Sequence, residues 1–221
     1  MSNYFVPASE ATIHLLTRLE RLENISVRAL LLTALFTGMR SGELRALQWA
    51  DIDTQRGLIN MSKSIDDLNR ATTPKTKSGV RIVQIDMRLA VFLAQYYREQ
   101  RDYIEAARGR VADNGIVFPA TTTGEHMNRG YPNRVIKTLI RDTDLPRDLH
   151  IHSLRHCFTS ILINTGADAK VVQTALGHSR VATTLDIYAH VFAATLAKSM
   201  QGVSLALTDS GNIFGVEMTS G

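Results

Sequence analysis

The 221-residue chain is long enough to bury a hydrophobic core without disulfide bonds or structural metals. Its hydrophobic fraction of 44% and charged fraction of 21% exclude a disordered or collagen-like chain. A net charge of +4 permits an anionic partner without requiring one, and a single cysteine, Cys157, excludes an internal disulfide or a four-thiolate zinc site. The sequence has no apolar run of membrane-spanning length and no signal-peptide pattern, so we expect a cytoplasmic protein without a membrane partner.

Hydrophobic periodicity predicts helices along most of the chain. Apolar residues recur at helical spacing over 9–23 and then from a Ser26 cap to Gly38, which ends the second helix. Ser41 can cap a third, short helix, which leaves Arg40 in a tight turn between two helices. Further helices are expected over 88–107, 133–142, 152–164, 168–176 and 183–201.

Only one stretch of the sequence has a pattern typical of β-strands. Segments 57–62 and 80–85 are β-branched and alternating, and a polar stretch with Pro74 and Gly79 separates them. The expected fold is mainly α with a small antiparallel β-sheet, in the α+β class. No linker divides the chain, so residues 1–202 are expected to form one domain. Residues 203–221 lose periodicity and are expected to be a tail, mobile or docked on a neighbouring protomer.

Two segments carry several basic residues and no acidic one. Each alone is typical of a solvated face, but two together favour a polyanion as partner. The first, residues 68–85, holds Arg70, Lys75, Lys77 and Arg81, and the second, residues 126–141, holds Arg129, Arg134, Lys137 and Arg141.

Histidines concentrate in one window, because five of the seven lie between residues 150 and 190. In the run HSLRH, His152 and Arg155 are three residues apart and project from one face of a helix. Arginine binds phosphate oxygens and histidine moves protons near neutrality, so this pair suits a phosphodiester. A surface ion-binding face or a helix cap remains the plain alternative.

His152 and His156 are also four residues apart, which is the spacing of a helical zinc site. Ser153 stands where a zinc protease needs a glutamate, and no third ligand is evident, so we expect no metal. His156 is expected to serve in hydrogen bonding and Cys157 to fill space beside it.

Downstream, His178 follows a glycine-terminated helix and Tyr188 lies ten residues later on another predicted helix. Either residue alone is more often a cap or a core side chain. A tyrosine can attack phosphorus only where nearby cations stabilise its phenolate and the charge that develops on phosphorus. The arginines and lysines described above are candidates for those cations.

These motifs together resemble the tyrosine recombinases, or phage-type integrases. TGMRSGELRALQWADID resembles the family's first arginine motif, KTKSGVRIVQI its β-hairpin lysine segment, HSLRH its His-x-x-Arg box and LGHS its second histidine box. The segment around Tyr188 resembles the nucleophile motif, and all boxes follow the family's order. The resemblance implies the catalytic-domain fold of DNA breaking-rejoining enzymes, with a catalytic set of Arg40, Lys77 (or Lys75), His152, Arg155, His178 and Tyr188, supported by Glu43.

The resemblance also implies a reaction. Tyr188 would attack a DNA phosphate to give a 3′-phosphotyrosyl link, Arg40 and Arg155 would clamp the non-bridging oxygens, and Lys77 would protonate the leaving 5′-oxygen. His152 would take the tyrosine proton and His178 would hydrogen-bond the phosphate. No cofactor is implied. The DNA-binding residues are expected to be Arg70, Lys75, Arg81, Arg129, Arg134 and Lys137.

The implied partners are double-stranded DNA at a recombination site of a phage or mobile element, further copies of the chain in a tetramer, and accessory DNA-bending or directionality proteins. The first arginine motif begins within about 40 residues of Met1, so we expect a catalytic domain alone, with the family's N-terminal DNA-clamping domain absent. Three alternatives stay open: a type IB topoisomerase, a catalytically silent DNA-binding domain, and a zinc hydrolase built on His152 and His156.

Overall fold

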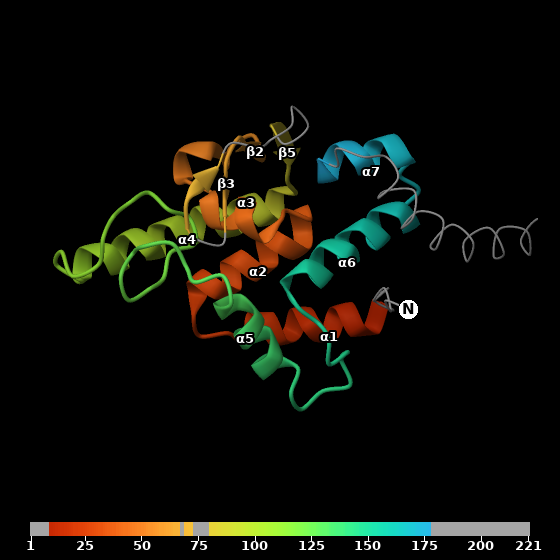
Figure 1. Cartoon of the computed structure of the whole chain (residues 1–221), viewed down its shortest axis with the longest axis horizontal. Helices are drawn as coiled ribbons and strands as arrows, with labels where there is room; N and C mark the ends of the chain where they lie inside the picture. The colour runs from red at the N-terminus through yellow and green to blue at the C-terminus, as the bar shows by residue number, and fades with distance from the viewer. Residues whose placement is uncertain (1–8, 67–68, 73–79, 178–221) are drawn as a thin grey trace, which may run out of the picture.

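A computed structural model describes residues 9–66, 69–72 and 80–177 of the chain. Within these residues seven α-helices accompany a small amount of β-structure, which lies at one edge of the molecule beside α3, and this confirms the predicted fold class (Figure 1). None of the described helices is long and apolar enough to cross a membrane. The helices are α1 (Ser9–Glu20), α2 (Ile25–Thr37), α3 (Ser41–Ala46), α4 (Met87–Ala106), α5 (Tyr131–Leu139), α6 (Ile151–Asn164) and α7 (Ala169–Leu176).

The β-structure consists of two small antiparallel sheets. In the larger one, strand order is β1-β2-β5, and β2 pairs with β5 in the register Ile59 to Val83. This is the predicted pairing of segments 57–62 and 80–85. The sequence did not predict the other strands, because two residues are too few to show an alternating pattern. The strands are β1 (Ile52–Asp53), β2 (Leu58–Met61), β3 (Ser64–Ile65), β4 (Ala71–Thr72) and β5 (Arg81–Gln84), and a 3₁₀ turn η1 (Trp49–Asp51) precedes β1.

Helix α2 forms the centre of the core. Nine of its thirteen residues are buried, since α1, α4, α5 and α6 all pack around it (Figure 1). Its N-terminal cap differs from the prediction. The Asn24 side chain accepts a hydrogen bond from the Val27 amide, whereas Ser26 lies inside the first turn and donates to the Pro119 carbonyl. The C-terminal end is as predicted, with Gly38 in the left-handed conformation.

Helix α3 lies against strand β3 at very short range. A Cβ atom on Gly42 would stand 2.6 Å from the Ser64 hydroxyl and 2.7 Å from the Ile65 carbonyl oxygen. Only glycine therefore allows α3 to pack this closely on β3. This contact fixes the short helix that follows Arg40 against the β-structure.

Helices α6 and α7 close one side of the molecule (Figure 1). Helix α6 packs along α2, and α7 packs on α6 through a small second core of Ile163, Val172 and Leu176. Asp168 caps α7 by accepting from the Val171 amide, and Gly177 ends it in the left-handed conformation, as predicted. The helix predicted over 183–201 and the tail 203–221 lie outside the described residues.

Candidate active site

The turn between α2 and α3 presents Arg40. Gly38 has φ +62°, and a Cβ there would stand 2.5 Å from the Phe158 ring of α6, so both the backbone and the space require glycine. Arg40 is the N-cap residue of α3, in place of the predicted Ser41. Its backbone amide donates to Glu43 Oε2 (2.8 Å) and its Nη1 to Glu43 Oε1 (3.1 Å), so one carboxylate fixes both the turn and the guanidinium.

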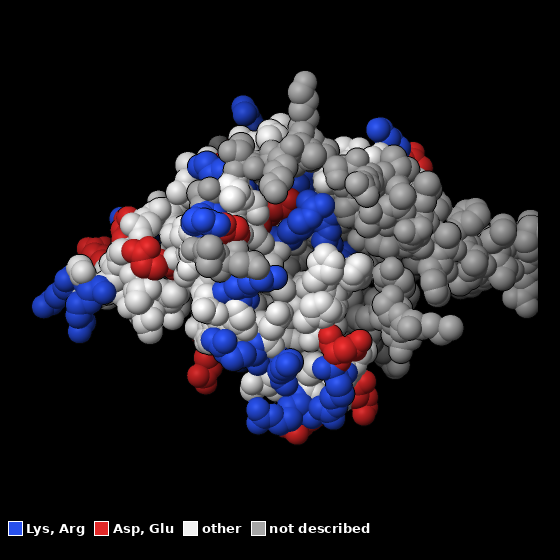
Figure 2. Space-filling model, viewed as in Figure 1, with Lys and Arg blue, Asp and Glu red and all other residues white. Residues whose placement is uncertain are grey.

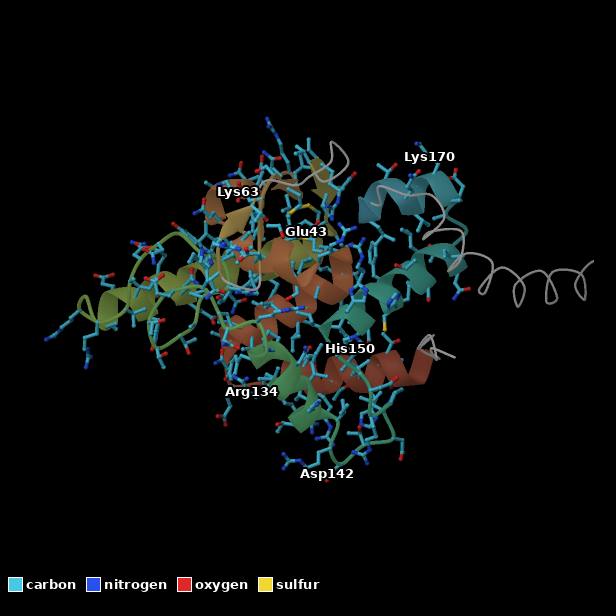
Figure 3. The ribbon with its side chains drawn as sticks, viewed as in Figure 1. Glu43, Lys63, Arg134, Asp142, His150 and Lys170 are labelled. Atoms are coloured by element: carbon cyan, nitrogen blue, oxygen red, sulfur yellow. The ribbon has the colours of Figure 1, made fainter. Side chains whose placement is uncertain are left out.

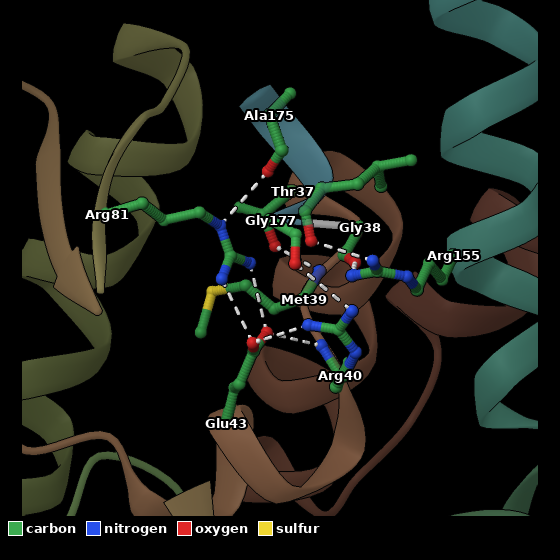
Figure 4. A network of polar contacts seen from close by, with 10 residues as sticks. Thr37, Gly38, Met39, Arg40, Glu43, Arg81, Arg155, Ala175 and Gly177 are labelled. Atoms are coloured by element: carbon green, nitrogen blue, oxygen red, sulfur yellow. Dashed lines mark hydrogen bonds and ion pairs between the residues drawn. The ribbon is translucent and has the colours of Figure 1, made fainter. Parts of the chain in front are cut away.

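Arg155 reaches the same turn from α6. Its guanidinium donates to the Gly38 carbonyl oxygen (2.5 Å) and to the Leu176 carbonyl oxygen (2.7 Å), and the residue is only 3% exposed. Burial, with the nearby charge of Arg40, lowers the pKa of Arg155 to about 9, which still leaves it charged at neutral pH. The sequence placed Arg40 and Arg155 in one site, and the structure brings them together at the turn of residues 38–40 (Figure 4).

The carboxyl end of α7 joins three arginines from three different elements. Ala175, Leu176 and Gly177 each offer one carbonyl oxygen, to Arg81 Nε (3.2 Å), Arg155 Nη2 (2.7 Å) and Arg40 Nη2 (3.3 Å) respectively (Figure 4). The C-terminal end of a helix carries partial negative charge, so it favours cations. We call Arg40, Arg81, Arg155 and Glu43 the arginine network.

Arg81 was expected to contact DNA, but its side chain lies inside the protein. Its side chain is 7% exposed, and Nη1 and Nη2 donate to Glu43 Oε1 and Oε2, both at 3.0 Å. The sequence could not show this, because the pair forms only when strand β5 lies beside α3. Arg81 therefore belongs to the interior of the arginine network.

Glu43, labelled in Figure 3, is the carboxylate shared by two arginines, as Figure 4 shows. Burial alone would raise its pKa, but the hydrogen bonds and charges of Arg81 and then Arg40 outweigh this effect and hold the pKa below its usual value. Glu43 therefore stays ionised at neutral pH. Three guanidiniums against one carboxylate leave the arginine network with an excess of two positive charges, which suits an anionic ligand.

His152 lies on α6 beside this network. Its ring meets the His156 ring edge to face, with 4.7 Å between centroids. Loss of hydration, followed by the charges of His156 and Arg155, lowers the pKa of His152 to about 4. His152 is therefore neutral at pH 7 and able to accept a proton.

The other residues of this helix have structural roles. His150 caps α6 by its contact with the Ser153 hydroxyl (2.7 Å). Cys157 is 1% exposed in the core, and burial raises its pKa to about 12, so its thiol stays protonated. Within the described ranges, no group of three or more His, Cys, Asp or Glu side chains is placed to hold a metal.

The remaining basic residues lie on the surface. Arg129, Arg134 and Lys137 are exposed on and before α5, where Lys and Arg side chains gather over the lower part of the view in Figure 2. The Arg134 guanidinium stacks over the Tyr131 ring at 5.5 Å. Arg70, 70% exposed, is paired with Asp66 (2.9 Å). Four predicted site residues lie outside the described residues: Lys75, Lys77, His178 and Tyr188.

Arg45 of α3, which was not predicted as a site residue, is buried at 1% exposure. Its Nε donates to the Met127 carbonyl oxygen (2.9 Å), and its Nη2 contacts Asn69 in the turn between β3 and β4. Asn69 has a positive φ of 59°. The sequence signal was weak, since an arginine amid apolar residues of a helix is usually expected at the surface.

A model of the phage integrase family matches residues 10–195, which is most of the chain. The chain therefore belongs to the phage integrase family. It is 33% identical over 162 residues to the ICEBs1 integrase of Bacillus subtilis, covering 72% of this chain and 43% of that protein. It is 30% identical over 188 residues to a XerC-like tyrosine recombinase of Caldanaerobacter subterraneus, covering 78% and 47% respectively.

The fold is also that of a solved integrase structure. A structure of the Tn1549 transposon integrase in complex with transposon right end DNA superposes with a TM-score of 0.74 at 21% identity, covering 92% of this chain and 67% of that one. The predicted catalytic-domain fold is thereby confirmed. The chain spans about half the length of the curated relatives described above.

Proposed function

We propose that this chain is a site-specific recombinase that cleaves and rejoins DNA strands of a phage or other mobile element through a 3′-phosphotyrosyl intermediate, in the cytoplasm of a bacterial cell. The observation that carries the proposal is the convergence of Arg40, Arg155 and a neutral His152 within a phage integrase fold. Fixed, partly desolvated guanidiniums stabilise charge that accumulates on phosphorus more than mobile surface cations do.

In the proposed cleavage, the Tyr188 oxygen attacks phosphorus and the bond from phosphorus to the 5′-oxygen breaks. Arg40 and Arg155 hold the non-bridging oxygens, whose charge is largest in the pentavalent transition state. His152 takes the tyrosine proton, Lys77 gives a proton to the leaving 5′-oxygen, and His178 hydrogen-bonds the phosphate. Rejoining is the reverse attack by a 5′-hydroxyl from a partner strand, so no external energy source is consumed.

Double-stranded DNA is the proposed substrate, and the exposed residues Arg129, Arg134 and Lys137 are proposed to contact its backbone, together with Arg70 and Lys75. Relatives of the fold are solved with DNA, as in the Tn1549 complex, which supports this assignment. Arg81 is withdrawn from the set of DNA contacts because both of its Nη atoms are paired with the Glu43 carboxylate, which neutralises its charge.

Covalent trapping tests the proposal. The protein is incubated with nicked duplexes, both of random sequence and from the junctions that flank its gene, and SDS-resistant protein–DNA adducts are counted. Wild type is expected to form an adduct and Tyr188→Phe none, while Tyr97→Phe, a change of an exposed tyrosine on α4, should behave as wild type. An adduct that persists in Tyr188→Phe, or none from wild type with DNA binding intact, would reject the proposal.

Plasmid relaxation, DNA binding and metal analysis separate the alternatives. Relaxation of supercoiled plasmid without strand exchange would favour a type IB topoisomerase, and DNA binding without any adduct would favour a silent domain. Stoichiometric zinc in the purified protein would favour a hydrolase built on His152 and His156.

We further propose that the active assembly is a tetramer on two duplexes, joined by accessory DNA-bending or directionality proteins, with residues 203–221 packed on a neighbouring protomer. Deleting the residues after Gly202 should weaken assembly on DNA and spare single-site cleavage. Unchanged assembly in a native gel would contradict the role of the tail.

A further inference from the structure

Arg81 is the member of the arginine network that the catalytic scheme leaves unused. It extends from β5, is 7% exposed, and binds both oxygens of Glu43 at 3.0 Å. Its Nε donates to the Ala175 carbonyl oxygen at the end of α7 (3.2 Å). Both Nη atoms of Arg81 are thus paired with a carboxylate, which neutralises its charge and leaves Arg81 poorly placed to bind a DNA phosphate.

Glu43 is the group through which Arg81 can act on Arg40. The Glu43 side chain is 6% exposed, and each of its oxygens accepts from both Arg81 and Arg40. A buried carboxylate that loses one of two cationic partners interacts more strongly with the remaining cation, because little water is available to replace the lost hydrogen bonds. Without Arg81, Glu43 would draw the Arg40 guanidinium toward itself.

The Arg40 guanidinium has N–H donors that a stronger interaction with Glu43 would engage. Its side chain remains 42% exposed, and among the described residues the guanidinium donates only through Nη1 to Glu43 and through Nη2 to the Gly177 carbonyl oxygen. The rest of the guanidinium is directed at no described acceptor (Figure 4). The number of Arg40 N–H donors that are available to a ligand therefore depends on whether Arg81 occupies the Glu43 oxygens.

We propose that Arg81 is a positioning residue for Arg40. By neutralising Glu43 and tying it to the end of α7, Arg81 keeps the Arg40 guanidinium available to a DNA phosphate. This inference rests on the proposed function, in which Arg40 clamps the scissile phosphate.

The first test compares cleavage by Arg81→Lys, Arg81→Met and wild type on the nicked duplex that wild type traps best. Lysine keeps the charge but cannot bind both carboxylate oxygens, so it separates charge from geometry and serves if the methionine variant fails to fold. We expect the single-turnover rate constant at saturating DNA to fall about 10-fold in the lysine variant and about 100-fold in the methionine variant, with the Kd for DNA little changed. Arg88→Gln, which breaks an exposed pair seven residues along the chain, is the matched control and should cleave as wild type.

The second test asks whether the defect passes through Arg40. A methylphosphonate at the scissile position replaces one non-bridging oxygen with a methyl group, which removes the charge that Arg40 is proposed to neutralise. The loss in Arg81→Lys should then shrink to less than about 3-fold, since the positioned cation matters less where less charge develops. An undiminished loss would assign Arg81 a merely structural role and overturn the inference.

The third test uses inorganic phosphate and no DNA, so it is independent of strand cleavage. Titration by calorimetry should show weaker phosphate binding in Arg81→Lys and Arg40→Gln, and the double variant should bind no more weakly than Arg40→Gln alone. Additive losses would show that Arg81 acts independently of Arg40 and overturn the inference. Failure of wild type to form a DNA adduct would reject the proposed function and leave this titration to decide on Arg81.

Discussion

Around the carboxyl end of α7, three guanidiniums are held by named acceptors in the protein, whereas on α5 the basic side chains point to solvent. Arg155 and Arg81 are almost completely buried, and two elements or more fix each of them. Arg134 and Lys137 are exposed, and Arg134 has only the Tyr131 ring beside it among the contacts described above. The first environment suits stabilisation of one phosphate at short range, and the second suits long-range attraction of a polyanion.

The largest expected effect is a loss of stability on replacing a buried arginine. Arg155→Ala would leave the Gly38 and Leu176 carbonyl oxygens without their donor, so the free energy of unfolding should fall by about 2–5 kcal/mol. Urea unfolding followed by circular dichroism measures this change. Arg98→Ala, at an exposed position on α4, is the control and should stay within about 0.5 kcal/mol of wild type. Equal effects of the two variants would remove the contrast between buried and exposed arginines.

The turn that carries Arg40 gives the next effect. Gly38→Ala forces an L-residue to φ +62° and places its Cβ 2.5 Å from the Phe158 ring, so we expect a loss of about 1–3 kcal/mol. The shift should also move the Gly38 carbonyl from Arg155 and slow DNA cleavage. Gly109→Ala is the matched control, because Gly109 also has a positive φ (79°) but nothing within 4 Å of its Cβ. If both variants lose the same stability, the close contact with Phe158 contributes nothing.

The third prediction uses pH. The pKa of His152 is about 4 in the folded chain and about 6.5 when unfolded, so the unfolded chain binds more protons between these values. Stability therefore falls as the pH drops from 6.5 toward 4, and the histidine stays neutral above that window. NMR titration of the His152 ring should show this low pKa, and His156→Gln should raise it because a positive neighbour is removed. A His152 pKa near 6.5 in wild type would contradict the proposed environment.

The smallest effect is expected on DNA binding, when an exposed basic residue of α5 is replaced. Each of Arg134→Gln and Lys137→Gln should weaken DNA binding uniformly across sequences and lower the slope of log K against log salt by about 1. Filter binding at several salt concentrations measures the slope, and Arg98→Gln is the control. A loss confined to one DNA sequence would indicate base recognition instead of backbone contact.

Local patterns in the sequence predicted much of this architecture. The amphipathic periodicity of α6 and α7, the continuous apolar character of α2 and the glycines that end α2 and α7 are local signals, so they could be read without the fold. The same is true of Arg40 at its turn. The pairing of Glu43 with Arg81 could not be predicted, because 38 residues separate them and the contact depends on packing of β5 beside α3. For the same reason Arg81 was expected on the surface.

Residue separation in the arginine network also has a consequence for the order of folding. Arg40 meets its acceptor on Gly177 across 137 residues, and Arg81 meets Ala175 across 94. A ribosome therefore completes both arginines long before it makes the helix end that holds them. Until α7 has been synthesised and has packed on α6, the growing chain lacks the carbonyl oxygens of Ala175 and Gly177 that hold these two guanidiniums. We expect a nascent chain to gain its phosphate-binding arrangement only once α7 has emerged and packed on α6, after the core around α2 has already emerged.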